Sequence, residues 1–116
     1  MSQQIIVNST THALIRAQSA AGDTETINMS DIGGTNGTSV VAIEYIEYSL
    51  IPDRKLEIKF TSNVVYELYG QGKFGAPERR ISRDMETPGE QSVVIDFENT
   101  NGKGSCLILL RKVSGF

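Results

Sequence analysis

The segment that most constrains the fold of this chain is the apolar run Cys106–Leu110 near the end of the sequence. It follows a polar stretch containing Asn101-Gly102, a dipeptide typical of tight hairpin turns. Such a near-continuous apolar run is characteristic of a strand covered on both faces. We therefore expect a hairpin whose return strand, 105–113, lies at the centre of a sheet, or between a sheet and a partner.

Other segments show the two-residue period of β-strands. In 55–61 the apolar side chains alternate with charged ones, which indicates one buried and one solvated face. Short links with turn residues, Pro52-Asp53 and Ser62-Asn63, join this segment to 40–50 before it and 64–70 after it. The three segments are therefore predicted to form a meander.

The period of 40–50 predicts which of its side chains share a face. Val41, Ile43 and Tyr45 fall on one side, and the other side receives Val40, Ala42, Glu44, Ile46 and Tyr48. With 92–98 and weaker candidates near the N-terminus, we count about seven or eight strands. The prediction is a single all-β domain spanning 1–116, an antiparallel β-sandwich or barrel-like meander.

Composition excludes several classes of protein. The net charge of −3 argues against nonspecific nucleic-acid binding, which depends on cationic surface. The single cysteine, Cys106, allows no intrachain disulfide and is expected to be a small buried hydrophobe. No run resembles a signal peptide or reaches the length of a membrane span, so synthesis in the cytoplasm and no membrane partner are expected.

The motif "GQGKFG", Gly70–Gly75, matches the glycine pattern of dinucleotide sites and follows a predicted strand. However, the next residues, 76–84, are too polar to form the helix that packs on such a sheet. We interpret the glycines as a turn or bulge and expect no cofactor. His12 has no metal ligand at suitable spacing, so no metal site and no catalytic residues are predicted, and the chain is not expected to be an enzyme.

Two segments are candidates for contacts with a partner. The loop 73–83 carries Lys73, Arg79, Arg80 and Arg83, but interleaved carboxylates offset their charge. We interpret it as a solvated loop or an interface rim, without specific nucleic-acid binding. The N-terminal segment 1–10 contains three apolar β-branched residues, Ile5, Ile6 and Val7, which predict either an edge strand of its own sheet or an arm that docks on a neighbour.

Three stretches carry a resemblance to a known group of proteins: "ETINMSDI", "VVYELYGQGKF" and the ending "NGKGSCLILLRKVSGF". With them the chain resembles small β-rich virion proteins of tailed bacteriophages, especially phages of marine bacteria. The resemblance implies a structural protein of the virion without enzymatic activity. One short domain without repeats favours a capsid decoration, or cement, protein that stabilises the shell by subunit contacts.

The resemblance also implies the partners. These are the major capsid protein or other virion proteins, and further copies in a homo-oligomer. The interface residues expected from the two candidate segments are Ile5, Ile6, Val7, Lys73, Arg79, Arg80 and Arg83. Two alternatives stay open: a tail or neck component, and a receptor- or carbohydrate-binding β module that uses Tyr45, Tyr48, Tyr66 and Tyr69 as aromatic platforms.

Overall fold

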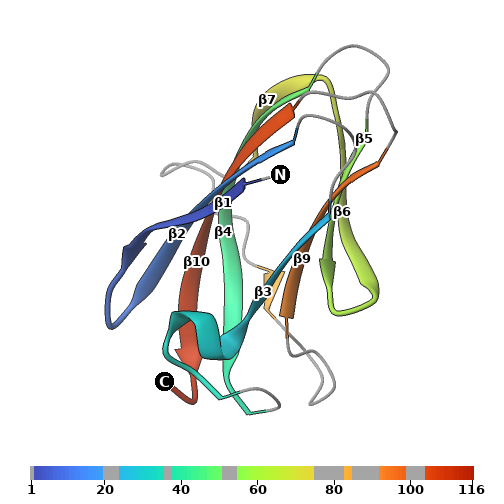
Figure 1. Ribbon diagram of the computed structural model, residues 1–116. Coiled ribbons are helices and arrows are strands. Elements are labelled where there is room, and N and C mark those ends of the chain that lie inside the picture. Colours follow the sequence, from blue (N-terminus) through green and yellow to red (C-terminus); the bar gives the residue numbers. More distant parts are fainter. Residues whose placement is uncertain are drawn as a thin grey trace.

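The computed structural model describes residues 2–19, 24–35, 38–50, 55–74, 83–84, 92–98 and 104–116. Within these residues the chain forms two antiparallel β-sheets that face each other (Figure 1). The predicted all-β antiparallel sandwich is confirmed. The described residues form ten strands, more than the seven or eight expected, and the shortest of them has only two residues.

Sheet A is built around the C-terminal strand. Its strand order is β1 (Ser2–Asn8), β2 (His12–Ser19), β10 (Gly104–Ser114), β4 (Val40–Leu50) and β7 (Gln71–Phe74), and the short β8 (Arg83–Asp84) also pairs with β4. The strand β10 therefore lies at the centre, with β2 on one edge and β4 on the other. This confirms the central position predicted from its apolar run.

Sheet B has the order β3 (Thr24–Asn28), β9 (Ser92–Glu98), β5 (Lys55–Phe60) and β6 (Asn63–Tyr69). A short 3-10 turn, η1 (Met29–Ile32), follows β3 and is capped by Asp31, whose carboxylate accepts a hydrogen bond from the backbone N–H of Asn28 at 2.8 Å. No helix among the described residues is long and apolar enough to span a bilayer.

Two predicted strand pairings are wrong. The strands β9 and β10 do not form a hairpin, because β9 pairs with β3 and β5 in sheet B whereas β10 pairs in sheet A. Likewise β4 lies in sheet A. Of the three strands expected in the meander, only β5 and β6 pair with each other, so the three-stranded meander does not exist. Turn residues report that a chain reverses, but they do not determine whether the next strand pairs with the previous one or crosses to the facing sheet.

The core fills the space between the sheets. Leu56, Ile58 and Phe60 of β5 point into it, as their alternation predicts, and they are fully buried. Sheet A contributes the inward side chains of its central strands: Ala13, Ile15, Ala17, Val41, Ile43, Ile46, Cys106, Ile108 and Leu110. Together these side chains form a single apolar cluster with those of sheet B.

A β-bulge changes the predicted faces of β4. In the register with β10, Leu110 is opposite Ile43 and Leu109 is opposite Tyr45, so Glu44 is an extra residue. A bulge shifts the alternation of the strand by one position. As a result Ile43 and Ile46 both point into the core, whereas the sequence period had assigned them to opposite faces.

The glycines of "GQGKFG" lie where the chain changes sheets, between β6 of sheet B and β7 of sheet A. Gly70 has φ = 74°, a left-handed conformation that favours glycine. Its carbonyl accepts a hydrogen bond from the backbone N–H of Leu50 at 2.8 Å. Gly72 lies opposite Tyr48, and a Cβ there would be 3.4 Å from the tyrosine hydroxyl. Gly70 therefore forms a bend, as predicted, whereas Gly72 lies within β7 and Gly75 lies outside the described residues.

The thiol of Cys106 faces the core and is 2% exposed. Burial raises its pKa to about 12, which keeps it protonated and unreactive at ordinary pH. We expect native protein to resist iodoacetamide at about pH 8, reacting at least about 10³-fold more slowly than protein in urea, since reaction requires unfolding. Mass spectrometry over time measures both rates; equal rates would show that β10 does not bury this side chain.

Candidate functional site

The face of sheet A that points away from sheet B carries the candidate site. On this outer face, Leu107 of β10 lies between Arg16 of β2 and Glu47 of β4 in the strand register. The next outward residue of β10, Leu109, lies between Leu14 and Tyr45 in the same way. The outward residues of β10 therefore include two half-buried leucines at the middle of the sheet.

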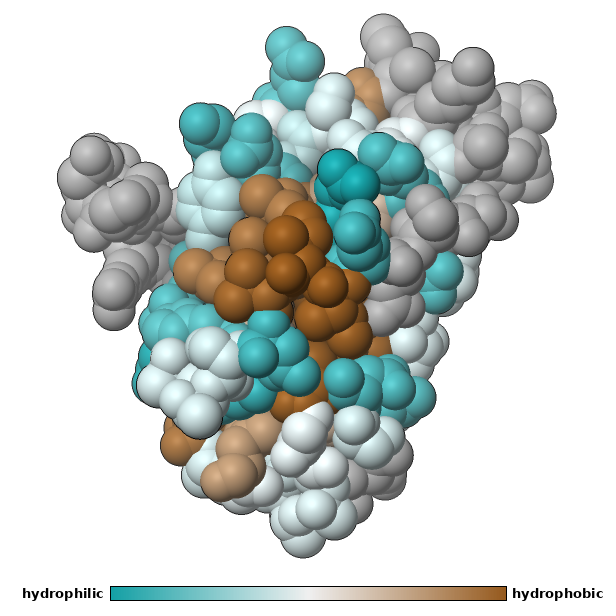
Figure 2. Space-filling view, turned by 60° about the vertical axis from the view of Figure 1, so that its left-hand side comes forward, coloured by the Kyte–Doolittle hydropathy of each residue, from teal (hydrophilic) through white to brown (hydrophobic). Residues whose placement is uncertain are grey.

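The N-terminal strand extends this apolar area. A bulge in β1 places Val7 opposite Leu14, whereas Ile5 lies opposite Ile15 and packs against the core. Ile6 and Val7 are 44% and 46% exposed. We define the outer apolar surface as Ile6, Val7, Leu14, Leu107 and Leu109. Figure 2 shows a continuous hydrophobic area on this side of the molecule, bordered by hydrophilic residues.

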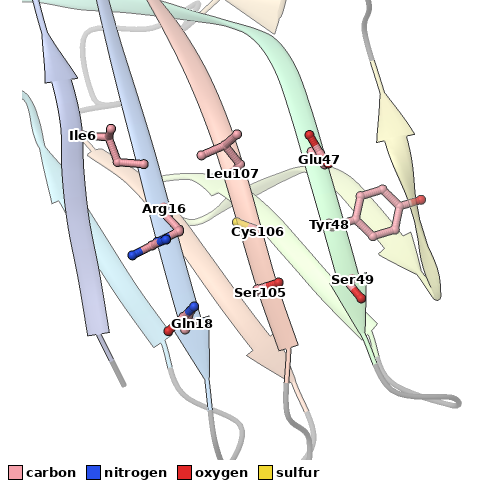
Figure 3. A pocket seen from close by; sticks show the side chains of 9 residues that line it. All are labelled: Ile6, Arg16, Gln18, Glu47, Tyr48, Ser49, Ser105, Cys106 and Leu107. Carbon is pink, nitrogen blue, oxygen red and sulfur yellow. The ribbon is translucent and has the colours of Figure 1, made fainter.

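A shallow hollow of about 360 Å³ adjoins Leu107 on the same face (Figure 3). Ser49 and Ser105 line it with small side chains, and Arg16 and Glu47 lie on either side of Leu107. Tyr45 donates a hydrogen bond to Glu47 at 2.9 Å, and Arg16 donates one to Gln4 at 2.9 Å. The face thus offers an apolar centre with a fixed cation on one side and a fixed anion on the other.

The outer face of sheet B has a different character. Lys59 forms an ion pair with Asp96 at 3.0 Å, and Thr24 donates a hydrogen bond to the same carboxylate at 3.1 Å. Lys55 lies 3.7 Å from Glu67. Charged side chains that pair with one another along a sheet are typical of a solvated face. The apolar surface is therefore a property of sheet A and not of both exterior faces.

A buried carboxylate lies at the end of the outer face where the β4 bulge occurs. The side chain of Glu44 is 7% exposed; it accepts a hydrogen bond from Arg111 Nε at 2.8 Å and lies 3.3 Å from His12 Nε2. His12 Nδ1 is 2.9 Å from the hydroxyl of Thr11. The described residues contain no cluster of side chains that would hold a metal ion. The Arg111–Glu44 ion pair joins β10 to β4, and the close approach of His12 brings β2 to the same carboxylate.

The predicted interface residues are only partly brought together. Ile6 and Val7 lie on the outer apolar surface, and Ile5 packs inward. Lys73, in β7, lies opposite Glu47 at the far side of the same sheet. Arg83 is in β8, but its side chain lies outside the described residues, as do Arg79 and Arg80.

Sequence reasoning did not assign Leu14, Leu107 and Leu109 to the interface. The signal was present in the terminal run, whose excess of apolar residues had indicated cover on both faces. The position of Leu14 beside Leu109 follows only from the strand register.

The four tyrosines do not line one groove. Tyr45 is on the outer face of sheet A, and Tyr69 is 60% exposed in sheet B. Tyr48 and Tyr66 pack against the core, although Tyr48 also borders the hollow.

Comparison with solved structures shows distant likenesses. The chain matches no family model and no curated protein sequence. Among solved structures it is similar to Bacillus endospore appendages, described as disulfide-linked pili, with 12% identity over 96% of this chain and 97% of that chain and a TM-score of 0.43. It is also similar to the Tobacco streak virus coat protein, with 8% identity over 96% and 93% of the two chains and a TM-score of 0.33. Likenesses this low carry no inference about function.

We expect Arg111→Met to destabilise the protein, because it removes a cation that pairs with the buried carboxylate of Glu44 at 2.8 Å. The loss should be about 2 kcal/mol, since an under-satisfied buried charge is costly while His12 remains close. Lys73→Met, at an exposed position of β7, is the matched control and should change stability by less than about 0.5 kcal/mol. Urea unfolding measures both; equal small effects would show that the pairing contributes nothing.

Proposed function

We propose that this protein is a structural component of a virus particle, without enzymatic activity, that works by contact with other protein subunits. The observation that carries the proposal is the outer apolar surface on a sandwich whose own core is complete. Monomeric proteins rarely leave continuous apolar areas exposed, and such areas mark protein interfaces when polar residues surround them.

Energetics favour a contact that uses much of this face. A standard stable interface buries about 800 Å² on each partner. That area is about one eighth of the 6110 Å² accessible surface of this chain, so one face of the sandwich is enough. Apolar surface contributes about 25 cal/mol for each Å² removed from water. The outer apolar surface is therefore the part of sheet A that gains most from being covered.

Two ionisable groups among the described residues are held in environments that do not favour reactivity. The thiol of Cys106 is buried and protonated, and the carboxylate of Glu44 is paired with Arg111. Neither has the accessible, activated environment that a nucleophile or general base needs. Both groups stabilise the sandwich instead.

The finer proposal follows from the resemblance to virion proteins of tailed bacteriophages. We infer a capsid decoration protein, located in the virion, that contacts the major capsid protein and stabilises the shell. A tail or neck component is the alternative. Both roles rely on contacts between protein subunits, so the position of the protein in the particle distinguishes them.

The test is to purify the virus particles whose genome encodes this chain. Heads and tails are then separated on a gradient, and both fractions are analysed by mass spectrometry. We expect the chain in the head fraction, in fixed ratio to the major capsid protein. If the chain is present in the tail fraction only, the protein is a tail component and not a capsid decoration protein. Absence from purified particles would contradict a virion function.

A variant pair tests whether sheet A makes the contact. Leu109→Lys places a charge within the outer apolar surface and should reduce incorporation into particles. Val64→Lys is the control, because Val64 is 48% exposed in β6 of sheet B. Equal incorporation of the two folded variants would show that the outer face of sheet A is not the contact surface.

A further inference from the structure

We propose that the outer face of sheet A packs against the same face of a second copy of this chain, related by a two-fold axis parallel to β10. The inference rests on the proposed function in one respect, that this face is a protein contact, and it names the partner. The reason for choosing a second copy is that the face is complementary to itself.

The charges show this complementarity. Across the sheet, Arg16 and Glu47 lie one strand to either side of Leu107, in one row of the register. A two-fold axis parallel to β10 exchanges the two sides of the face while keeping each row at its own level. It therefore places Arg16 of one copy over Glu47 of the other, and Glu47 over Arg16. Both contacts form at once because an isologous interface repeats every pairing.

The neighbouring row of the register, which runs from Leu14 through Leu109 to Tyr45, matches in the same way. Leu109 meets its own copy on the axis, and Leu14 of one chain lies over Tyr45 of the other. A leucine against a tyrosine ring is a favourable pair on facing sheets. At the outer limits of the charged row, Gln4 of β1 lies over Lys73 of β7, a pairing without repulsion.

The other in-plane direction of the axis is disfavoured. An axis perpendicular to the strands and level with Leu107 would place Arg16 over Arg16 and Glu47 over Glu47, and like charges directly opposed are repulsive. With the axis along β10, Arg111 also approaches its own copy. Its guanidinium is, however, already paired with Glu44 at 2.8 Å, which offsets the repulsion.

The distances of sheet packing permit the charge contacts. Facing sheets lie about 10 Å apart, a gap that an arginine and a glutamate can span together. The usual angle of about 30° between aligned sheets displaces residues one strand from the axis by only about 2–3 Å. Tyr45 occupies one oxygen of Glu47 and Gln4 engages one nitrogen of Arg16, so both groups keep further hydrogen-bonding capacity.

Charge reversal tests the arrangement on the full chain. In the Arg16→Glu dimer, the new glutamate of each copy faces Glu47 of the other copy. In the Glu47→Arg dimer, the new arginine of each copy faces Arg16 of the other copy. We expect each variant to raise the dimer dissociation constant by at least about tenfold, measured by sedimentation equilibrium. Both positions are exposed, so thermal melts of the dissociated variants should match wild type at the same dilution.

Mixing the two variants is the decisive arm. A chain with Arg16→Glu and a chain with Glu47→Arg present opposite charges at both contacts, so the mixture should form a heterodimer at least about tenfold tighter than either homodimer. The double variant, with both reversals in one chain, should regain most of the wild-type affinity. A mixture no tighter than its components, or a wild-type chain that stays monomeric, would overturn the proposal.

The outcome is separable from that of the proposed function. A dimer with the predicted charge behaviour but without presence in particles would leave this inference intact and remove the virion role. Monomers in solution whose charge variants still enter particles normally would refute the second copy as the partner and leave the virion role standing.

Discussion

The pairing of β10 with β2 on one edge and β4 on the other is the interaction on which the rest of the structure depends. It places the apolar run Cys106–Leu110 at the middle of sheet A. One set of its side chains, Cys106, Ile108 and Leu110, is buried against sheet B. Because alternate side chains of a strand point to opposite faces, Leu107 and Leu109 must then lie on the exterior. The same strand thus supplies core and contact surface.

Much of the fold could be predicted from local patterns, and what could not depends on register. The alternation of Leu56, Ile58 and Phe60 predicted β5 and its inward face, and the apolar run predicted a central β10. The Asn101-Gly102 signal misplaced β9, because turn chemistry does not decide which sheet the next strand joins. The bulge at Glu44 has no local signature, since an extra residue is visible only against the partner strand. For the same reason, the position of Leu14 beside Leu109 could not be predicted from the sequence.

The two exterior faces of the sandwich have different functions in this account. The outer face of sheet B carries ion pairs such as Lys59–Asp96, which are compatible with contact with water. Sheet A carries half-buried leucines on its outer face, and one of them, Leu107, lies between Arg16 and Glu47. This face therefore combines a favourable gain on burial with charges that fix orientation. Leaving such a surface uncovered invites aggregation. We therefore expect this face to be covered in the working form of the protein, and we propose a second copy as the partner that covers it.

Thiol labelling of Leu109→Cys tests this claim most directly, because buried Cys106 gives the native chain almost no background reaction. We expect rapid labelling at high dilution, where the outer face is open. We expect progressive protection as the protein concentration rises and the second copy covers the face. A fast rate that does not depend on concentration would contradict coverage by a second copy. A slow rate at high dilution would show that residue 109 does not face outward.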